Sequence, residues 1–275
     1  MNKSRIEWLD GGYTWNPVTG CLHNCEYCYA KKQTKRFEGK TQPVIDYFAV
    51  YNGNPIYYIN NRAYKETKAG DMVVDTYPFG FDPTFHRYRL DEPQKIKKPQ
   101  NIFVCSMADL FGEWVPDEWI RQVFEACEEA PWHRYLFLTK NPRKYDLLIE
   151  WDHPMNDHIY IGATATNTAT FDDYSYKLCN LRTESGHLMV NTFLSVEPIQ
   201  EEIKNDYLDR VRYVGWVIIG AETGNRKGKV IPKREWIENI VSECREHNVP
   251  VFLKDSLAKI WGGELIQEYP WGGKE

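Results

Sequence analysis

Short apolar runs recur along the chain and are typical of buried parallel strands. They occur at Asn101–Ser106, Tyr135–Thr139, Ile159–Ala163, Thr192–Val196, Trp216–Gly220 and Val251–Lys254, with an earlier one at Tyr13–Trp15. Between these runs, apolar residues at helical spacing predict helices over Pro116–Glu129, Pro142–Ile149, the Asp173–Leu181 region and Pro232–His247. Strand, loop and helix therefore alternate, which predicts an α/β fold built on a parallel sheet or barrel.

Polar residues follow the apolar runs, where the carboxyl ends of parallel strands form the ligand sites of such folds. These residues are Ser106 and Asp109, Thr139 and Lys140, Thr164 and Asn167, Ser195 and Glu197, Glu222 and Thr223, and Lys254 and Asp255. Any single one is explained equally well as a helix cap. Their recurrence after strand upon strand favours a shared binding site.

Residues 38–100 interrupt this rhythm. The segment is rich in Tyr and Phe, carries the basic run Lys95–Lys98, and is too long for one barrel loop. We predict a single domain over residues 1–275, with an inserted, β-rich and aromatic-rich lid at about 38–100.

The segment Gly20–Ala30 reads GCLHNCEYCYA and places three cysteines at the spacing C-x3-C-x2-C. Thiolates hold iron–sulfur clusters, and a [4Fe-4S] cluster bound by Cys21, Cys25 and Cys28 would keep one iron open for a ligand. The alternatives are a zinc site completed by His23 or a distant cysteine, and unreactive thiols.

Composition adds limits to this picture. The chain has 275 residues, of which 42% are hydrophobic, and 34 basic against 39 acidic side chains give a net charge of −5. This charge argues mildly against tight non-specific binding of nucleic acid but leaves room for a local basic groove. No apolar stretch of about 18 residues predicts a membrane span, and no apolar signal core opens the chain, so we expect no membrane association and a cytoplasmic location.

Beyond the cysteines, the segment Thr14–Ala30 resembles the start of a family of radical S-adenosylmethionine-like proteins of undetermined function that is common in phages and prophages. The resemblance continues through blocks at Tyr77–Pro93, Phe103–Pro116, Phe137–Tyr145, Ser195–Pro198 and Trp216–Gly224. The cysteine loop alone is also similar to that of spore photoproduct lyase, through the YCY at the third cysteine.

The resemblance implies a partial parallel (β/α)6-type radical S-adenosylmethionine barrel, with the [4Fe-4S] cluster and S-adenosylmethionine as cofactors. The open iron would chelate S-adenosylmethionine, and Asp109 would contact its amino group in place of the usual Gly-Gly-Glu. Ser195 and Glu197 would meet the ribose or carboxylate, Tyr27 would pack near the adenine, and Glu222 and Lys254 would lie nearer the substrate. The implied reaction is reductive cleavage of S-adenosylmethionine followed by hydrogen abstraction, with an electron donor such as flavodoxin or ferredoxin.

Cys105 lies in a predicted strand and is either a hydrogen-atom donor, as a thiol is in the photoproduct lyase, or a small buried apolar residue. Cys127, Cys179 and Cys244 stand apart in predicted helices, so we expect a single cluster.

Basic residues follow two of the predicted strands and favour a polyanionic substrate. They are Lys140, Arg143 and Lys144 after one strand and Arg226, Lys227 and Lys229 after another. The leading hypothesis is a radical enzyme that modifies or repairs a nucleic acid or nucleotide. One alternative is a peptide- or protein-modifying radical enzyme, and another is a non-catalytic iron–sulfur or zinc protein that binds a phage or host partner.

Overall fold

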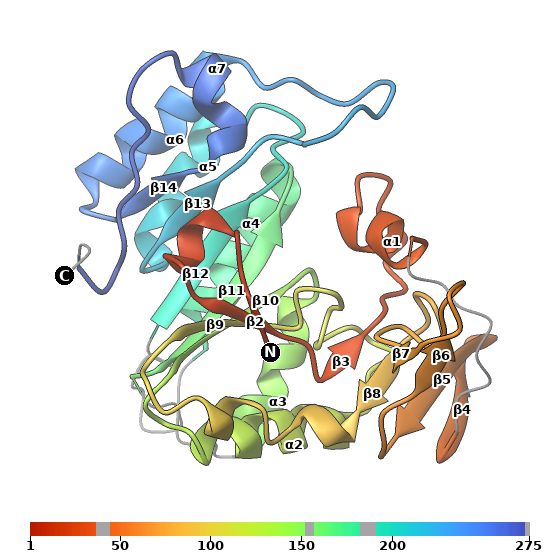
Figure 1. Ribbon diagram of the computed structural model, residues 1–275. Helices are drawn as coiled ribbons and strands as arrows, with labels where there is room; N and C mark the ends of the chain where they lie inside the picture. The colour runs from red at the N-terminus through yellow and green to blue at the C-terminus, as the bar shows by residue number, and fades with distance from the viewer. Residues whose placement is uncertain (37–44, 152–156, 182–190, 273–275) are drawn as a thin grey trace. The chain divides into compact units, whose positions relative to one another are not determined.

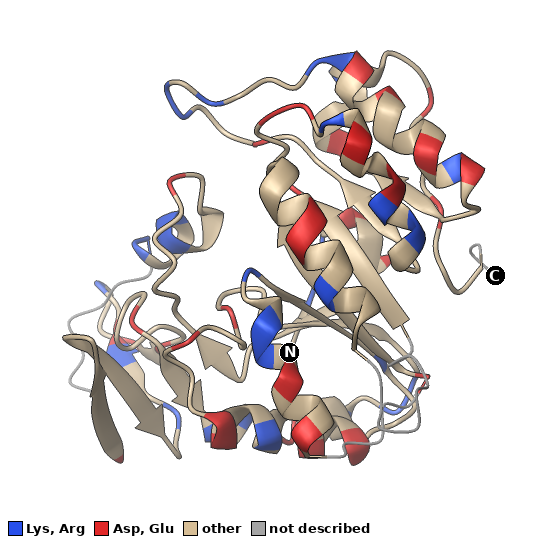
Figure 2. Cartoon of the chain, turned by 180° about the vertical axis from the view of Figure 1, so that it is seen from behind, with Lys and Arg blue, Asp and Glu red and all other residues tan. Residues whose placement is uncertain are grey.

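The computed structural model describes residues 1–36, 45–151, 157–181 and 191–272, so the start of the predicted insertion lies outside the described residues. Two compact units are present (Figure 1). Unit 1 comprises Met1–Lys3 and Gly12–Tyr135, and unit 2 comprises Ser4–Gly11 and Leu136–Glu275. Charged side chains lie mainly on helices and loops, and the strands carry few of them (Figure 2). No helix in the described part of the chain is long and apolar enough to span a membrane.

Unit 1 contains a small parallel pairing that leads into the cysteine loop. Strand β2 (Tyr13–Trp15) runs parallel to β9 (Asn101–Val104) and antiparallel to β1 (Asn2–Lys3). Helix α2 (Asp117–Glu128) has acidic residues in its first turn and buries one apolar face, as its periodicity predicts. The remaining helical elements are α1 (Tyr29–Thr34), η2 (Arg87–Arg89) and η3 (Pro93–Lys95).

A second sheet of unit 1, called here the aromatic sheet, has the strand order β3-β8-β5-β4. Its strands are β3 (Val18–Thr19), β8 (Thr84–His86), β5 (Asn54–Ile59) and β4 (Tyr47–Tyr51), and a separate hairpin joins β6 (Tyr64–Glu66) to β7 (Met72–Val74). The ring of Tyr57 stacks on Phe79 at 3.6 Å, and Phe85 stacks on Trp119 of α2 at 5.1 Å. Aromatic packing therefore joins this sheet to the helix of the same unit.

Unit 2 holds four parallel strands in the order β11-β12-β13-β14. They are β11 (Ile159–Ala165), β12 (Asn191–Val196), β13 (Val217–Ile219) and β14 (Val251–Leu253), and β10 (Arg134–Thr139) spans the boundary between the units. The helical elements are η1 (Glu7–Leu9), η4 (Pro142–Tyr145), α3 (Asp146–Glu150), α4 (Thr168–Cys179), α5 (Asn205–Leu208), η5 (Asp209–Tyr213), α6 (Arg234–Glu246), η6 (Asp255–Leu257) and α7 (Ala258–Trp261).

These elements confirm the predicted mixed α/β architecture with mostly parallel strands, but not the barrel, since the described strands form no closed sheet. One helix begins earlier than predicted. Helix α4 starts at Thr168 rather than near Asp173, because the Asn167 side chain accepts a hydrogen bond from the Thr170 backbone at 2.9 Å and caps the helix. The cap interpretation therefore holds for Asn167.

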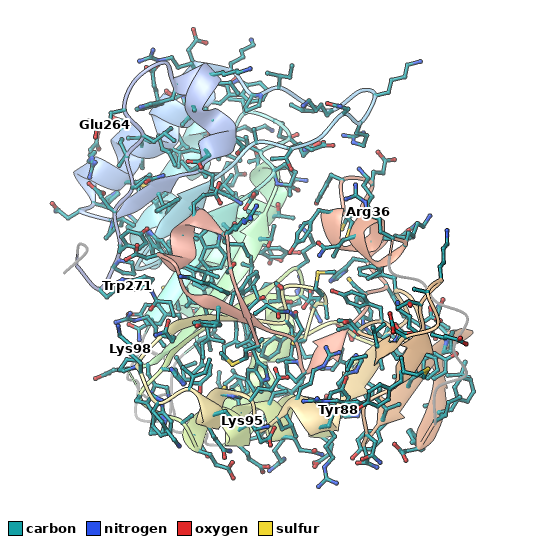
Figure 3. The ribbon with its side chains drawn as sticks, viewed as in Figure 1. Arg36, Tyr88, Lys95, Lys98, Glu264 and Trp271 are labelled. Carbon is teal, nitrogen blue, oxygen red and sulfur yellow. The ribbon has the colours of Figure 1, made fainter. Side chains whose placement is uncertain are left out.

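Trp216 lies at the centre of the unit 2 core and is fully buried. Its ring lies 5.8 Å from that of Phe193 and 5.4 Å from that of Trp271, which Figure 3 labels near the C-terminal end of the chain. Its indole nitrogen donates to the Glu268 carbonyl at 2.9 Å. The aromatic residues of this unit thus pack with one another beneath the strands that carry the predicted site residues.

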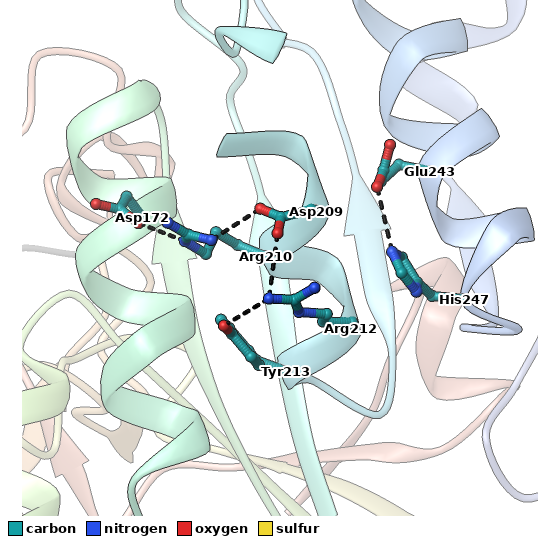
Figure 4. Close-up of polar contacts among 7 residues, drawn as sticks. All are labelled: Asp172, Asp209, Arg210, Arg212, Tyr213, Glu243 and His247. Atoms are coloured by element: carbon teal, nitrogen blue, oxygen red, sulfur yellow. Dashed lines mark hydrogen bonds and ion pairs between the residues drawn. The ribbon is translucent and has the colours of Figure 1, made fainter. Parts of the chain in front are cut away.

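Ion pairs link helical elements of unit 2. Arg210 on η5 donates to Asp172 on α4 and to Asp209, each at 2.8 Å (Figure 4). At the end of α6, the C-cap residue His247 lies 3.2 Å from Glu243, four residues earlier. The side chains of these pairs remain 22–38% exposed, so solvent screens each pair in part and its contribution to stability is modest.

A buried histidine in unit 1 makes stability depend on pH. His86 is fully buried and bonds to Thr19 at 2.8 Å, and its burial and the nearby Arg89 guanidinium hold its pKa well below the usual value. In the unfolded chain the same imidazole takes up a proton near pH 6.5. We expect the free energy of unfolding to fall as pH drops below about 6.5, by up to about 1.4 kcal/mol per pH unit for this one proton.

Denaturant unfolding of the wild type and of His86→Gln, at neutral pH and at about pH 5.5, checks this expectation. Glutamine keeps a polar partner for Thr19 but does not titrate. A smaller loss of stability on acidification is expected for the variant. Equal losses in the two proteins would contradict the assignment to His86.

Candidate functional site

The cysteine loop begins at Gly20, directly after β3. This glycine has a φ of +86°, and a Cβ atom here would lie 2.3 Å from the Asp82 carbonyl oxygen. Its backbone nitrogen donates to the Met107 carbonyl at 2.9 Å. Only glycine fits both the backbone conformation and this close approach. The first residue of the loop is thereby fixed against two distant segments of unit 1.

Three half-buried thiols follow on this loop. Cys28 caps helix α1, since its sulfur accepts a hydrogen bond from the Lys31 backbone at 3.4 Å. Its own backbone nitrogen donates to the Cys25 carbonyl at 3.1 Å. Burial is the main cause that raises the pKa of Cys21; Asp109, and then Cys25 and Cys28, raise it further, and a backbone hydrogen bond at His23 lowers it.

His23, inside the cysteine motif, ties the loop to the segment that follows β9. Its Nε2 lies 2.7 Å from Oδ2 of Asp109, and Oδ1 of the same carboxylate accepts from the Phe111 backbone at 3.0 Å. The His23 ring also meets the edge of Trp114 at 4.9 Å. Asp109 is buried, and both of its oxygens have partners in the protein. This carboxylate therefore positions the loop in addition to any contact it makes with a ligand.

The donor set of the loop suits an iron–sulfur cluster, because three thiols are close together and the other four cysteines lie on different elements. In the part of the chain that the structure describes, no three His, Cys, Asp or Glu side chains are gathered as around a single metal ion. A cubane cluster makes a different demand from a single metal ion. Each thiolate binds a different iron, so the sulfurs that hold a cluster stand farther apart than those around one ion.

The other predicted residues of unit 1 lie around this loop and after β9. Tyr27 is half-buried, and the hydroxyl of its neighbour Tyr29 donates to the Ser106 carbonyl at 2.6 Å. Cys105 is buried directly after β9, with a φ of +58°, and its backbone nitrogen donates to Trp15 at 2.7 Å. Burial raises the pKa of the Cys105 thiol to about 12, which keeps it protonated at neutral pH.

In unit 2, two of the predicted residues meet at the carboxyl ends of β12 and β14. The ammonium group of Lys254 lies 2.5 Å from Glu197, and it also lies 3.9 Å from Glu7. A Cβ atom at Gly220 would lie 3.0 Å from side-chain carbons of both Glu197 and Lys254, so glycine leaves room for this pair. Ser195 is buried within β12, two residues before Glu197.

The connection from β13 to α6 carries the second charged feature of unit 2. Glu222 is buried and accepts two hydrogen bonds from Arg226, at 2.7 and 2.8 Å. Residues 223–234, called here the basic loop, contain five lysines and arginines and no acid. In Figure 2 the blue of Lys and Arg marks positions toward the outer end of this connection. Glu222 therefore holds Arg226, the first basic residue of the loop, through a bidentate ion pair.

The structure thus brings Glu197 and Lys254 together in unit 2, and Asp109 together with the cysteine loop in unit 1. Sequence reasoning missed the parts played by His23 and Glu7. The position of His23 between two cysteines of the motif could have indicated its role. Nothing in the sequence indicated a role for Glu7, because it precedes the predicted strands and approaches Lys254 only in the folded chain.

Comparison with solved structures finds spore photoproduct lyase. One structure is a cysteine-to-serine mutant, with a TM-score of 0.51 and 12% identity over 92% of this chain and 78% of that chain. A second, complexed with dinucleoside spore photoproduct, has a TM-score of 0.51 and 11% identity over 86% and 74% of the two chains. A third, a double mutant with bound AdoMet and dinucleoside spore photoproduct, has a TM-score of 0.51 and 10% identity over 87% and 75%.

At these identities the likeness is one of fold. No curated protein matches the sequence. A family model described as "Protein of unknown function (DUF5131)" matches residues 3–263, which is nearly the whole chain. The chain therefore belongs to this family of undetermined function.

Proposed function

We propose that this protein is a radical S-adenosylmethionine enzyme whose [4Fe-4S] cluster is held by Cys21, Cys25 and Cys28. The observation that carries the proposal is the C-x3-C-x2-C set of cysteines on one loop, which Gly20 and the cap of α1 hold at its two ends. The fold supports it, because one of the similar solved structures contains bound AdoMet. The reduced, reconstituted protein should convert S-adenosylmethionine to methionine and 5′-deoxyadenosine, and the absence of both products would contradict the proposal.

When bound, the cluster would supply the electron that breaks the S–C5′ bond of S-adenosylmethionine, which releases methionine and allows hydrogen abstraction from a substrate by the 5′-deoxyadenosyl group. In unit 1, the three cysteines hold the cluster, Asp109 is the candidate contact for an amino group, and Tyr27 is the candidate for an adenine. Cys105 is a candidate hydrogen-atom donor because it lies directly after β9, at the carboxyl end of a parallel strand. The electron would come from a flavodoxin- or ferredoxin-like protein.

In unit 2, Ser195, Glu197, Glu222 and Lys254 are the candidate ligand contacts, because they lie at or just beyond the carboxyl ends of parallel strands. The Glu197–Lys254 pair offers both a hydrogen-bond acceptor and a donor to a polar ligand.

The substrate class we propose is a nucleic acid or nucleotide. Three of the similar solved structures contain a dinucleoside, and the basic loop concentrates positive charge in a chain whose net charge is −5. Such a local cluster of cations suits phosphate groups, which supply most of the non-specific affinity for nucleic acids.

Neutralising the basic loop tests this proposal. We expect the triple variant Lys227→Gln, Lys229→Gln, Lys233→Gln to bind single-stranded DNA more weakly. The slope of log affinity against log salt concentration should also be shallower, by the equivalent of up to about three phosphate contacts. The matched control removes Lys95, Lys97 and Lys98 by the same substitution, and Figure 3 labels Lys95 and Lys98 on unit 1.

Fluorescence anisotropy over a range of salt concentrations measures both quantities. The control should keep the salt dependence of the wild type. Equal losses in the two triple variants, or no binding by the wild type at low salt, would count against the basic loop as a nucleic-acid contact.

A further inference from the structure

The aromatic sheet of unit 1 ends at β4, which pairs with β5 and, among the described strands, with no other. The strand reads YFAVY and contains no charge, proline or glycine. Natural edge strands usually carry lysine, proline or a bulge that blocks pairing with another chain. The outer edge of β4 lacks each of these residue-based protections.

This strand is also unusually exposed for its composition. Tyr47 is 57% exposed, Phe48 51% and Val50 60%. Among the described residues, eleven large hydrophobic side chains are exposed, and eight of them lie between residues 45 and 74: Ile45, Tyr47, Phe48, Val50, Tyr64, Met72, Val73 and Val74. Four of these eight belong to β4 and the residues just before it, and exposed apolar side chains that adjoin one another mark interaction surfaces on proteins.

The sequence of β4 indicates what pairs with it. In an antiparallel pairing of two β4 strands centred on Ala49, Tyr47 faces Tyr51 of the second copy and Phe48 faces its Val50. Aromatic–aromatic and aromatic–β-branched pairs are the favourable cross-strand combinations. One position further out, Asp46 faces Asn52, so no like charges oppose each other.

A nucleic acid is a poor occupant for this edge, because residues 45–61 contain Asp46 and no lysine or arginine. A strand that matches itself in reverse suits a two-fold axis, where the same patch of both subunits meets. We propose that β4 is a dimerisation strand through which two copies of the chain join their aromatic sheets edge to edge, with the two-fold axis at Ala49. This proposal is independent of the chemistry proposed for the cysteine loop.

Sedimentation velocity at several micromolar concentrations tests it. The wild type should approach twice the monomer mass of 32.4 kDa. Phe48→Glu and Val50→Lys, each alone, put a charge opposite an apolar side chain and should give monomers. The double variant places each new carboxylate opposite a new ammonium group, so it should recover the dimer.

Tyr176→Lys on α4 is the matched control, since Tyr176 is 62% exposed but belongs to unit 2 and not to the aromatic sheet, and it should remain dimeric. Far-UV circular dichroism confirms that each variant is folded. A wild type that stays monomeric at every concentration, or folded single variants that stay dimeric, would overturn the proposal. A monomeric double variant would overturn the antiparallel register.

Discussion

Replacement of Cys28 with alanine should reduce the bound iron of the anaerobically reconstituted protein from about four atoms per chain to a small fraction and abolish cleavage of S-adenosylmethionine. Two of three thiolates cannot hold a cubane tightly, and none of the other cysteines belongs to the cysteine loop. The fold should persist, because Cys28 is only half-buried and loss of its cap on the short helix α1 costs about 1 kcal/mol. Iron assay and chromatographic detection of 5′-deoxyadenosine measure the two losses.

Cys179→Ala is the matched control for this experiment. Cys179 is also half-buried, but it lies on α4 in unit 2. This variant should bind the same amount of iron as the wild type and cleave S-adenosylmethionine equally well. Full iron content and cleavage in Cys28→Ala would show that the cluster ligands have been misassigned.

The Glu197–Lys254 pair should show a strong energetic coupling in unit 2. Only 15% of the Lys254 side chain and 25% of the Glu197 side chain are exposed, so removing one member leaves the other as a poorly solvated charge. We expect Lys254→Met and Glu197→Gln each to lower the free energy of unfolding by about 1–3 kcal/mol. The double variant should lose less than the sum, with a coupling of about 0.5–3 kcal/mol.

The exposed pair of Lys95 and Asp91 provides the control cycle, with 60% and 56% of the side chains exposed and a similar distance of 2.7 Å. Its coupling, measured with Lys95→Met and Asp91→Asn, should be about 0.3–0.5 kcal/mol. Denaturant unfolding of the wild type and the six variants measures both cycles. If the Glu197–Lys254 coupling is no larger than that of the control, the pair does not form the tight contact seen here.

The sequence was most informative where apolar runs are continuous. The run Ile159–Ala163 predicted β11, and Thr192–Val196 predicted β12, because strands covered on both faces need no polar alternation. The start of α4 could not be placed in this way, since Asn167 is equally plausible as a cap and as a site residue. The closure of the sheet depends on strand positions that no local pattern encodes.

In the candidate site, too, local features could be predicted from the sequence and long-range contacts could not. The cysteine spacing is local and could be recognised directly in Cys21–Cys28. The contact of His23 with Asp109 joins residues that are 86 positions apart in the sequence. The residues of the Lys254–Glu7 contact are separated by even more of the chain, so only the fold reveals these two contacts. Glu222 was predicted as a ligand contact, and the structure adds that it holds Arg226.

The most direct test of the cluster is anaerobic reconstitution with quantification of iron and sulfide, followed by EPR spectroscopy of the reduced protein with and without S-adenosylmethionine. The account predicts about four irons per chain and a spectrum that changes when S-adenosylmethionine is added, because the open iron gains a ligand. Stoichiometric zinc without iron, or a spectrum that S-adenosylmethionine leaves unchanged, would contradict it.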